Sequence, residues 1–562
     1  MSTSSRRLTL WVALLSCLWA IGLGRSAAQV PLPLVPDDSK PIPLPGNVAA
    51  FPAPTQDAGD YLRRGQELER EGRWADAVVF YEEALRRFPT DGTLLHRYQH
   101  SRLRVDVTRR WRDASFVGVV DSLTMPQAVD ALNEALLKVQ VHYVEPVGWT
   151  PLVQLSLREL TYTLSDGQLW ARYGRKFSPE TWQALAAQWD QLVSVRPPAD
   201  RYQAAMLLTE AARLAEARTG LPATALIMEC LCTVSNLLDI YSCYLTPQQL
   251  REILSQIEGN FVGLGVELKG EDGGLTIVRV IQGSPAEAAG LRPGDRILSV
   301  GDQPTASLPP EAAADLLQGP EGSLVRVTVA SPGQAPREVW VRRAHVDVPS
   351  VEGVRLVDPA AGVAYLRIMA FQKTTPKEVD SALWSLYYQG MRSLIIDLRG
   401  NPGGLLGSAV EVADRFLDRG VIVYTRGRNV IEDCTYIAHE EGTWRVPLVV
   451  MIDGQSASAA EIFAAAIRDH RRGSLVGTPS YGKGSVQGIF PLGSHPGGLR
   501  LTTSRFYSPA GRPFTLEGVV PDVLLRQAAR PVSTSAQQPT PQEDYALSVA
   551  IQTARELIAK RP

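Results

Sequence analysis

The chain is 562 residues long, which is too long for one hydrophobic core and predicts three or four domains. Hydrophobic residues make up 45% of the chain and charged residues 21%, values typical of folded globular proteins, which excludes a chain that is disordered throughout. The formal net charge of −2 supplies no basic field, so we expect no nucleic acid partner.

The N-terminus has the pattern of a secretory signal peptide. Arg6 and Arg7 precede an apolar run over residues 8–23, and small residues lead to a predicted cut after Ala28. An uncleaved anchor is one alternative, although the run is short for a membrane span. Lipidation at Cys17 is another, although the residues after it stay apolar. We expect export to the periplasm or the extracytoplasmic side of the membrane, with membrane association only if this segment is retained or lipidated.

Four cysteines follow the predicted cut, namely Cys230, Cys232, Cys243 and Cys434. Four cysteines in a chain of this length do not make a disulfide framework. Cys-x-Cys spacing without a histidine cluster is a poor zinc site. We therefore expect buried thiols, with one disulfide at most, and no metal.

Residues 29–57 are rich in proline and predict an extended linker. Helical periodicity then begins near residue 58, and the spacing of small and aromatic residues from Gly65 to Pro89 resembles a tetratricopeptide repeat. An ordinary helical hairpin is the alternative. A lone repeat cannot bury its own face, so this unit should dock on neighbouring helices, and it is a candidate site for a protein partner. The helical pattern continues to about residue 257.

From residue 261, short β-branched runs separated by glycines replace the helical pattern. The strings FVGLGVEL and GSPAEAAGLRPGD, within a stretch of about 85 residues, resemble a PDZ domain. Glycines let successive backbone N–H groups converge on a peptide carboxylate, and the following strand edge can pair with the peptide. A small barrel that only packs against its neighbours is the alternative. The predicted peptide-binding residues are Phe261, Gly263, Leu264, Gly265, Val266 and Leu268.

Strands and helices alternate from residue 350 to about 525, which favours an α/β core with a buried sheet. Within it, VPLVVMID, GQSA and SAAEIFAAAIRD predict a strand, a loop and a helix. Ser458 begins the helix and Glu461 follows three residues later, which is the pattern of a capping box and by itself requires no catalysis. Ser456 lies in the same turn, and these residues alone do not decide between the two serines.

A second strand-to-helix turn follows the string LIIDLRG and contains Asn401, Pro402, Gly403 and Gly404. Glycines at such a turn let backbone N–H groups face outward at the positive end of a helix. These groups, together with the N–H of Ala459, are candidate donors for the oxyanion of an acyl-transfer intermediate. A plain tight turn is the alternative.

Lys483 lies between two glycines, immediately before an apolar strand. Only eight of the 57 basic residues are lysines, and Lys483 is the only one between residues 378 and 559. Arg stays protonated and cannot act as a base, whereas burial lowers the pKa of a lysine by several units. If the strand starts at Lys483, Gln487 lies on the same face and can hydrogen-bond the amine. The sequence therefore predicts a general base here, and a surface lysine at a turn is the alternative.

Eight strings, in order, between about residues 235 and 527 resemble the C-terminal processing proteases, also called tail-specific proteases. They are LDIYSCYLTPQQL, FVGLGVEL, GSPAEAAGLRPGDRI, LIIDLRGNPGGLL, SASAAEI, YGKGSVQ, TTSRFYSPAGRPF and GVVPDV. The chain is similar to that family in having Ser and Lys 25 positions apart and Gln four positions after the Lys. The resemblance selects Ser458 over Ser456 and implies that Lys483 and Gln487 belong to the catalytic set. The resemblance implies a crotonase-like core and a PDZ domain that gates substrate entry.

The sequence departs from the family at two strings and in its first part. DIYSCYL replaces the usual Asp-Pro-His-Ser segment, which lies outside the catalytic set, and Gln455 stands where Gly is more usual. The first 230 residues inherit no role from the resemblance. The implied activity is that of a serine endopeptidase with a Ser-Lys dyad, no cofactor, and substrates with exposed C-terminal tails. A catalytically idle scaffold of PDZ and tetratricopeptide modules is the alternative.

The predicted fold is multidomain. It combines a helical N-terminal region containing a tetratricopeptide-like unit, a β-rich PDZ-like domain and an α/β crotonase-like protease core. The predicted divisions are 1–28 (signal peptide), 29–57 (linker), 58–115 (tetratricopeptide-like unit), 116–258 (helical region), 259–346 (PDZ domain), 347–528 (protease core) and 529–562 (tail with a C-terminal helix).

Overall fold

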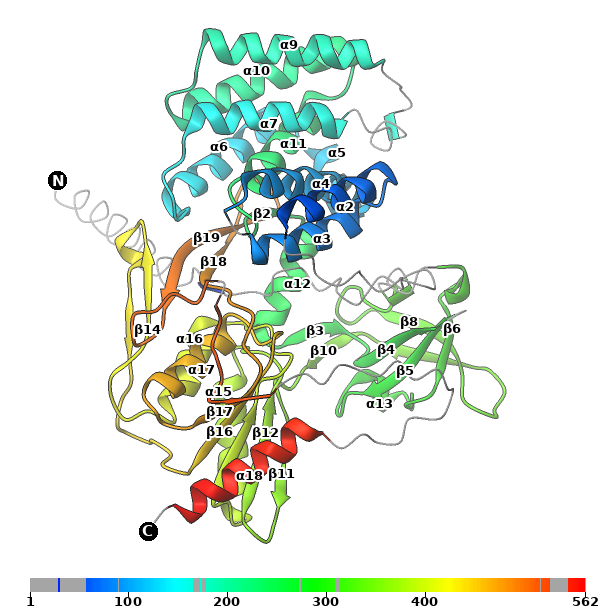
Figure 1. Ribbon diagram of the computed structural model, residues 1–562. Coiled ribbons are helices and arrows are strands. Elements are labelled where there is room, and N and C mark those ends of the chain that lie inside the picture. The colour runs from blue at the N-terminus through cyan, green and yellow to red at the C-terminus, as the bar shows by residue number, and fades with distance from the viewer. Residues whose placement is uncertain are drawn as a thin grey trace, which may run out of the picture.

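The computed structural model describes residues 29–30, 57–88, 90–164, 172–173, 178–271, 274–308, 313–314, 316–515, 517–525 and 544–560. The predicted signal peptide, including Cys17 and Ala28, and most of the Pro-rich linker lie outside these residues. The described residues form a helical region, a β-rich domain and an α/β core (Figure 1). Within them, the cysteines form no disulfide. None of their helices combines the length and apolarity that a membrane span requires.

The helical region begins with α2 (Ala58–Arg70), α3 (Trp74–Arg87) and α4 (Gly92–Arg112). Helices α2 and α3 approach closely because a glycine faces a ring: a Cβ atom at Gly65 would lie 2.2 Å from the Tyr81 ring. Ala77 and Ala84 of α3 are fully buried beside them. This hairpin packs on α4, as expected for a unit that cannot bury its own face. Its assignment as a tetratricopeptide repeat stays a prediction.

More helices form a bundle above the core (Figure 1). They are α5 (Ala114–Ser122), α6 (Met125–His142), α7 (Trp149–Leu164), α9 (Pro179–Val195), α10 (Arg201–Thr219) and α11 (Ala223–Asn236). Helix α12 (Pro247–Glu258) lies below this bundle and leads toward the β-rich domain (Figure 1). Prolines lie between α6 and α7 and between α9 and α10, where a helix cannot continue. The short strand β2 (Cys243–Leu245) between α11 and α12 pairs with a strand of the core, β19, so the bundle and the core share a sheet.

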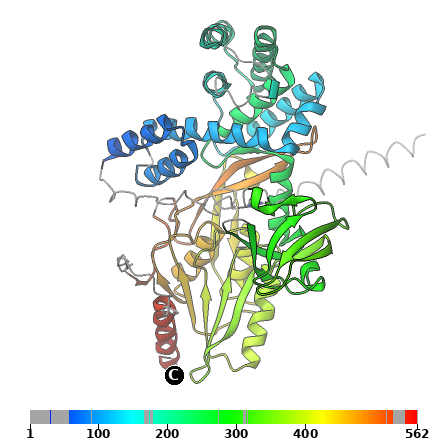
Figure 2. The ribbon, with the colours of Figure 1, turned by 90° about the vertical axis from the view of Figure 1, so that its right-hand side faces the viewer.

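The β-rich domain lies beside the core and below the helical region (Figure 2). Its sheet has the order β4-β5-β6-β8-β9, with β7 paired to β6, so β4 is an edge strand. A separate two-stranded ribbon, β3 and β10, joins the domain to its neighbours. The strands are β3 (Asn260–Gly263), β4 (Val266–Glu271), β5 (Gly274–Val280), β6 (Arg296–Val300), β7 (Gln303–Pro304), β8 (Leu324–Ala330), β9 (Arg337–Arg342) and β10 (Ala344–Asp347); the short helix is α13 (Pro285–Ala288).

The sheet of the α/β core has the order β11-β12-β13-β16-β17-β20, with β11 antiparallel at one edge and the others parallel. Helices cover both faces, and the inner strands are accordingly continuous apolar runs. The strands are β11 (Val351–Asp358), β12 (Val363–Ile368), β13 (Ser393–Asp397), β16 (Leu448–Ile452), β17 (Ser474–Gly477) and β20 (Val523–Leu524). The helices on one face are α15 (Thr375–Tyr388), α16 (Leu406–Asp414) and α17 (Ala459–Asp469).

The opposite face is covered by α18 (Tyr545–Ala559), whose Ala550 and Ala554 are fully buried against the sheet. The helix expected in the C-terminal tail is therefore part of the core. The crotonase-like class of this core stays a prediction.

A second sheet connects the core to the helical region and has the order β1-β18-β19-β14-β15. The strands are β1 (Gln29–Val30), β14 (Val421–Gly427), β15 (Thr435–Ile437), β18 (Ser485–Pro491) and β19 (Gly498–Tyr507). The β18–β19 hairpin reaches up to the helical region (Figure 1), where Phe490 and Leu499 join its hydrophobic core. Gln29 and Val30, which were expected in the linker, instead pair with β18.

Candidate active site

Ser458 lies at the turn between β16 and α17. Its backbone has φ 58° and ψ −114°, a conformation that residues other than glycine rarely adopt. Such strain persists only where the surrounding structure holds it, and it is concentrated at functional sites. The Ser458 hydroxyl is buried and has no hydrogen-bond partner among the described residues. Ser458 and Glu461 occupy the positions of the expected capping box, but the hydroxyl makes no hydrogen bond that caps the helix.

Glu461 forms the other half of the box and also reaches a second loop. Its Oε2 accepts hydrogen bonds from the backbone N–H groups of Ser458 (2.7 Å) and Lys483 (2.9 Å). Its Oε1 accepts from the Ser480 hydroxyl (2.6 Å) and the Gly482 N–H (2.7 Å). Burial raises the pKa of Glu461 to about 7, although these hydrogen bonds act in the opposite direction. One fully buried carboxyl group thus holds the turn of Ser458 against the loop of Lys483.

The sequence indicated only the capping role of Glu461. One feature of the sequence could have indicated further hydrogen bonds, namely that Glu461 follows a strand that is apolar throughout. Such a position predicts burial, and a buried carboxylate that accepts one cap bond needs donors for its remaining lone pairs. Which donors would fill them depends on a loop about 20 residues further along the chain.

Lys483 lies in the loop between β17 and β18. Its side chain is buried, and its amine is 5.2 Å from the centre of the Tyr241 ring. Burial lowers the pKa of this amine well below its usual value and the charge of Arg500 lowers it further, while Glu461 and Asp239 act in the opposite direction. Lowering the pKa favours the neutral amine, the form that can accept a proton.

Tyr241 belongs to DIYSCYL, the string that departs from the family pattern and that we expected outside the catalytic set. The structure places its ring against the Lys483 amine. No sequence pattern indicated this contact, because the two residues belong to segments that are far apart along the chain.

Gln487 does not make the expected hydrogen bond to Lys483. The Gln487 Nε2 group donates to the Ser485 hydroxyl (3.0 Å), and its Oε1 is buried without a hydrogen-bond partner among the described residues. The strand begins at Ser485 rather than Lys483, and the register shifts between Val486 and Gln487. Ser485 and Gln487 do share a face, but Lys483 lies before the strand and outside the alternation on which the expectation rested.

The glycine turn after β13 packs directly against Ser458. A Cβ atom at Gly403 would lie 2.8 Å from the Ser458 Cβ and 3.0 Å from the Ala459 nitrogen. The Gly403 N–H, however, donates to Asn401 Oδ1 (2.8 Å), so the prediction that it is a free oxyanion donor is wrong for this conformation. Among the described hydrogen bonds, none uses the N–H of Gly404 or Ala459, and these two remain candidates.

Two family models match the chain: that of peptidase family S41 over residues 362–525 and that of the PDZ domain over residues 276–331. The chain is 35% identical over 296 residues to a carboxy-terminal-processing protease of Bartonella bacilliformis, covering 52% of this chain and 67% of that protein. It is 33% identical to a carboxyl-terminal-processing protease of a Synechocystis species, covering 52% of this chain and 69% of the relative. The chain belongs to peptidase family S41.

Among solved structures, this S41 peptidase is similar to the photosystem II D1 C-terminal processing protease. The two are 25% identical, the match covers 72% of this chain and 94% of that one, and the TM-score is 0.38.

The PDZ domain of the S41 peptidase presents its β4 edge beside the glycine loop. Gly265 has φ 82°, and a Cβ atom there would lie 2.2 Å from the Ser284 Cβ, so only glycine fits. Val266 and Leu268 are partly buried and pack on the domain core. The Leu264 side chain is fully enclosed in that core, so a direct side-chain contact between Leu264 and a peptide is excluded in this conformation.

The remaining predicted residues of this region, Phe261 and Gly263, lie on β3, which pairs with β10 outside the PDZ sheet. A Cβ atom at Gly263 would lie 2.7 Å from the Phe261 ring, so the two residues are in close contact.

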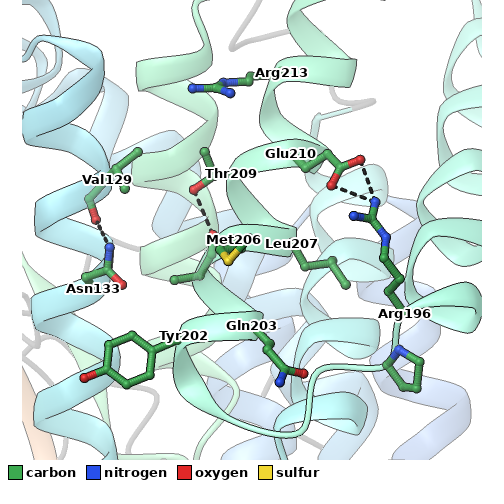
Figure 3. Close-up of a pocket in the computed structure, with 12 residues that line it drawn as sticks. Val129, Asn133, Arg196, Tyr202, Gln203, Met206, Leu207, Thr209, Glu210 and Arg213 are labelled. Carbon is green, nitrogen blue, oxygen red and sulfur yellow. Dashed lines mark hydrogen bonds and ion pairs between the residues drawn. The ribbon is translucent and has the colours of Figure 1, made fainter.

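The S41 peptidase also has a cavity of about 830 Å³ in its helical region (Figure 3). Met206 and Tyr202 of α10 line it and are largely exposed, and Arg196 forms an ion pair with Glu210 (2.6 Å) at its rim. Its lining residues come from helices α6 and α10 and from the segment before α10, whereas Ser458 and Lys483 lie in the core.

Proposed function

We propose that this protein is a serine endopeptidase in which Ser458 is the nucleophile and Lys483 the general base, acting on exported proteins. The observation that carries the proposal is the link through Glu461 between a buried hydroxyl without a hydrogen-bond partner and a buried amine of lowered pKa. A capping serine would use its hydroxyl, and a structural lysine would keep its charge, so neither simpler role accounts for this pair.

In the proposed reaction the neutral Lys483 amine takes the proton of the Ser458 hydroxyl as Oγ attacks the substrate carbonyl carbon. The carbonyl oxygen becomes an oxyanion, which the N–H groups of Gly404 and Ala459 bind. The Lys483 ammonium then gives its proton to the leaving amine, the peptide bond breaks, and an acyl-enzyme remains. Water, activated by the neutral amine, hydrolyses this ester and restores Ser458. In the substrate complex, Gln487 Oε1 accepts a hydrogen bond from the amine and orients it.

The substrate tail is proposed to pair with the free edge of β4, with its carboxylate at the loop over residues 263–265. Backbone pairing at a sheet edge supplies affinity with little dependence on sequence, and side-chain contacts supply preference. Val266 and Leu268 are the side chains of this strand nearest to such a peptide. Tail recognition would deliver the extended chain to Ser458.

Cleavage of casein by the full chain tests the catalytic assignment. Ser458→Ala and Lys483→Met are each expected to lower activity by at least about 10³-fold, because removing one member of a nucleophile–base pair removes most of the catalysis. Ser458→Ala should keep the thermal unfolding midpoint of the wild type, since the hydroxyl makes no hydrogen bond. A Ser458→Ala variant with full activity would falsify the assignment. A wild-type protein that binds tail peptides but cleaves none would favour the scaffold alternative.

The pH dependence tests the role of Lys483. Because the pKa of Lys483 is lowered, its neutral form is populated at lower pH than that of an ordinary lysine, and kcat/KM should rise with pH through that pKa. Lys483→Arg should be inactive throughout, because a guanidinium stays protonated. A wild-type profile without a rising limb would contradict a lysine base.

A further inference from the structure

The loop that carries Lys483 is held from outside by the helical region. The Tyr481 hydroxyl donates a hydrogen bond to Glu82 Oε1 of α3 (3.0 Å). Arg86, one helical turn further along α3, lies 4.0 Å over the Tyr481 ring and pairs with Glu82 (3.3 Å). A hydrogen bond to a charged acceptor and a cation over a ring are both stronger than neutral surface contacts. Together they fix Tyr481, two residues before Lys483.

A second wall around the Lys483 amine is also fixed by the helical region. The Tyr241 ring faces the amine, and Arg102 of α4 holds the backbone on both sides of it. The Arg102 guanidinium is almost fully buried and donates to the carbonyl oxygens of Ile240 (2.8 Å) and Ser242 (3.1 Å). Helices α3 and α4 therefore each anchor one tyrosine: Tyr241, whose ring faces the amine, and Tyr481, which lies two residues before Lys483 in the same loop.

We propose that the α2–α4 unit is a positioning element of the peptidase site, in which Glu82 and Arg86 hold Tyr481 and so keep the Lys483 loop closed around its amine. This inference rests on the proposed Ser458–Lys483 mechanism. The proposal assigns a role in catalysis to helices that neither family model matches. The peptidase model covers residues 362–525 and the PDZ model residues 276–331.

The expected direction follows from the charges around the two side chains. The amine is flanked by Tyr241, by Arg500 of β19, Glu461 of α17 and Asp239 after α11, and burial is the largest influence on its pKa. Tyr481 faces Glu82, Arg86 and Tyr241. Releasing Tyr481 would let water reach the amine and stabilise its ammonium form. The pKa of Lys483 would then rise, and less of the neutral base would be present near neutral pH.

The test is the pH profile of casein cleavage by the full chain carrying Glu82→Ala or Arg86→Ala. Each substitution should move the rising limb of kcat/KM to higher pH by roughly one unit, which is about a tenfold loss below the limb and no loss on the alkaline plateau. The matched control is Glu67→Ala, which removes the Glu67–Arg64 ion pair on α2 of the same unit and should keep the wild-type profile. A purely structural role would instead lower the activity equally at every pH, and that result would overturn the proposal.

A double-mutant cycle tests the route through Tyr481. If Glu82 acts by holding the Tyr481 hydroxyl, adding Tyr481→Phe to Glu82→Ala should produce no further shift of the limb. Additive shifts would overturn this route.

Ser458→Ala in the same assay separates the two proposals. If Ser458→Ala is inactive and the α3 variants keep the wild-type profile, only the positioning role fails. If Ser458→Ala is active, the proposed function fails and the positioning role fails with it.

Discussion

Two neighbouring parallel strands of the core, β13 and β16, each end in a turn that leads into a helix. In the turn after β13, Gly403 and Gly404 have φ 109° and 135°, values that glycine adopts without steric cost. In the turn after β16, Ser458 has φ 58°, where a side chain is strained. The backbone of the second turn alone would therefore favour glycine. The difference indicates that the hydroxyl, rather than the turn, accounts for a serine at this position.

The two turns are also packed against each other. The N–H of Ala457 donates to the Asn401 carbonyl oxygen (2.9 Å), and a side chain at Gly403 would collide with Ser458. The glycines of the first turn therefore make room for the strained serine of the second. Substitutions in the two turns can separate their contributions to stability and activity.

The largest effect is expected from Gly404→Ala in the first turn. The new Cβ would lie 2.2 Å from the Phe371 carbonyl oxygen, a backbone atom that cannot rotate away. We expect the free energy of unfolding to fall by about 3 kcal/mol and casein cleavage to fall about 100-fold, since a proposed oxyanion donor is displaced. Gly407→Ala in α16, where no atom lies within 4 Å of the new Cβ, is the control and should be no less stable than the wild type. Equal stability of the two variants in urea denaturation would contradict the close packing of the turns.

A smaller loss is expected from Asn401→Ala. The buried Asn401 side chain accepts from the Gly403 N–H and donates to the Ile368 carbonyl oxygen (2.9 Å), so its removal leaves two buried polar groups unpaired. The free energy of unfolding should fall by about 2 kcal/mol. Asn429→Ala is the control, because Asn429 caps an exposed short helix through one long bond (3.3 Å) and its loss should cost less than about 1 kcal/mol. Similar losses for both variants in urea denaturation would show that the first turn does not depend on its buried asparagine.

The smallest effect has the opposite sign. Ser458→Gly should raise the free energy of unfolding by about 1 kcal/mol relative to Ser458→Ala, because glycine adopts a positive φ without strain. This gain exceeds the loss that comes from the greater conformational freedom of glycine in the unfolded chain. Both variants should be inactive. If Ser458→Gly is the less stable of the two in urea denaturation, the strain assigned to the second turn is absent.

Local patterns predicted the elements that carry the site. Apolar runs predicted the buried strands before each turn. The turn, the Arg-rich surroundings and the family spacing selected Ser458 and Lys483 as candidates. The hydrogen bond expected between Lys483 and Gln487 is absent in this conformation, because the strand begins at Ser485, a boundary that alternation alone does not mark. The assignment of Gly403 as an oxyanion donor is wrong for this conformation because its N–H donates to the side chain of Asn401, two residues earlier.

The sequence by itself determined the PDZ and peptidase domains, the helical region before them and the strand-to-helix turns, because these depend on motifs, on periodicity and on the backbone freedom of glycine. Only the tertiary structure decided which N–H groups stay unbonded and that Glu461 joins the two loops. It also decided that the Tyr241 ring faces the Lys483 amine, and that Tyr481 of the same loop is hydrogen-bonded to α3. The physical reason is that burial and hydrogen-bond partners are set by segments up to about 400 positions apart along the chain, as in Glu82 and Tyr481. No local pattern encodes such a pair.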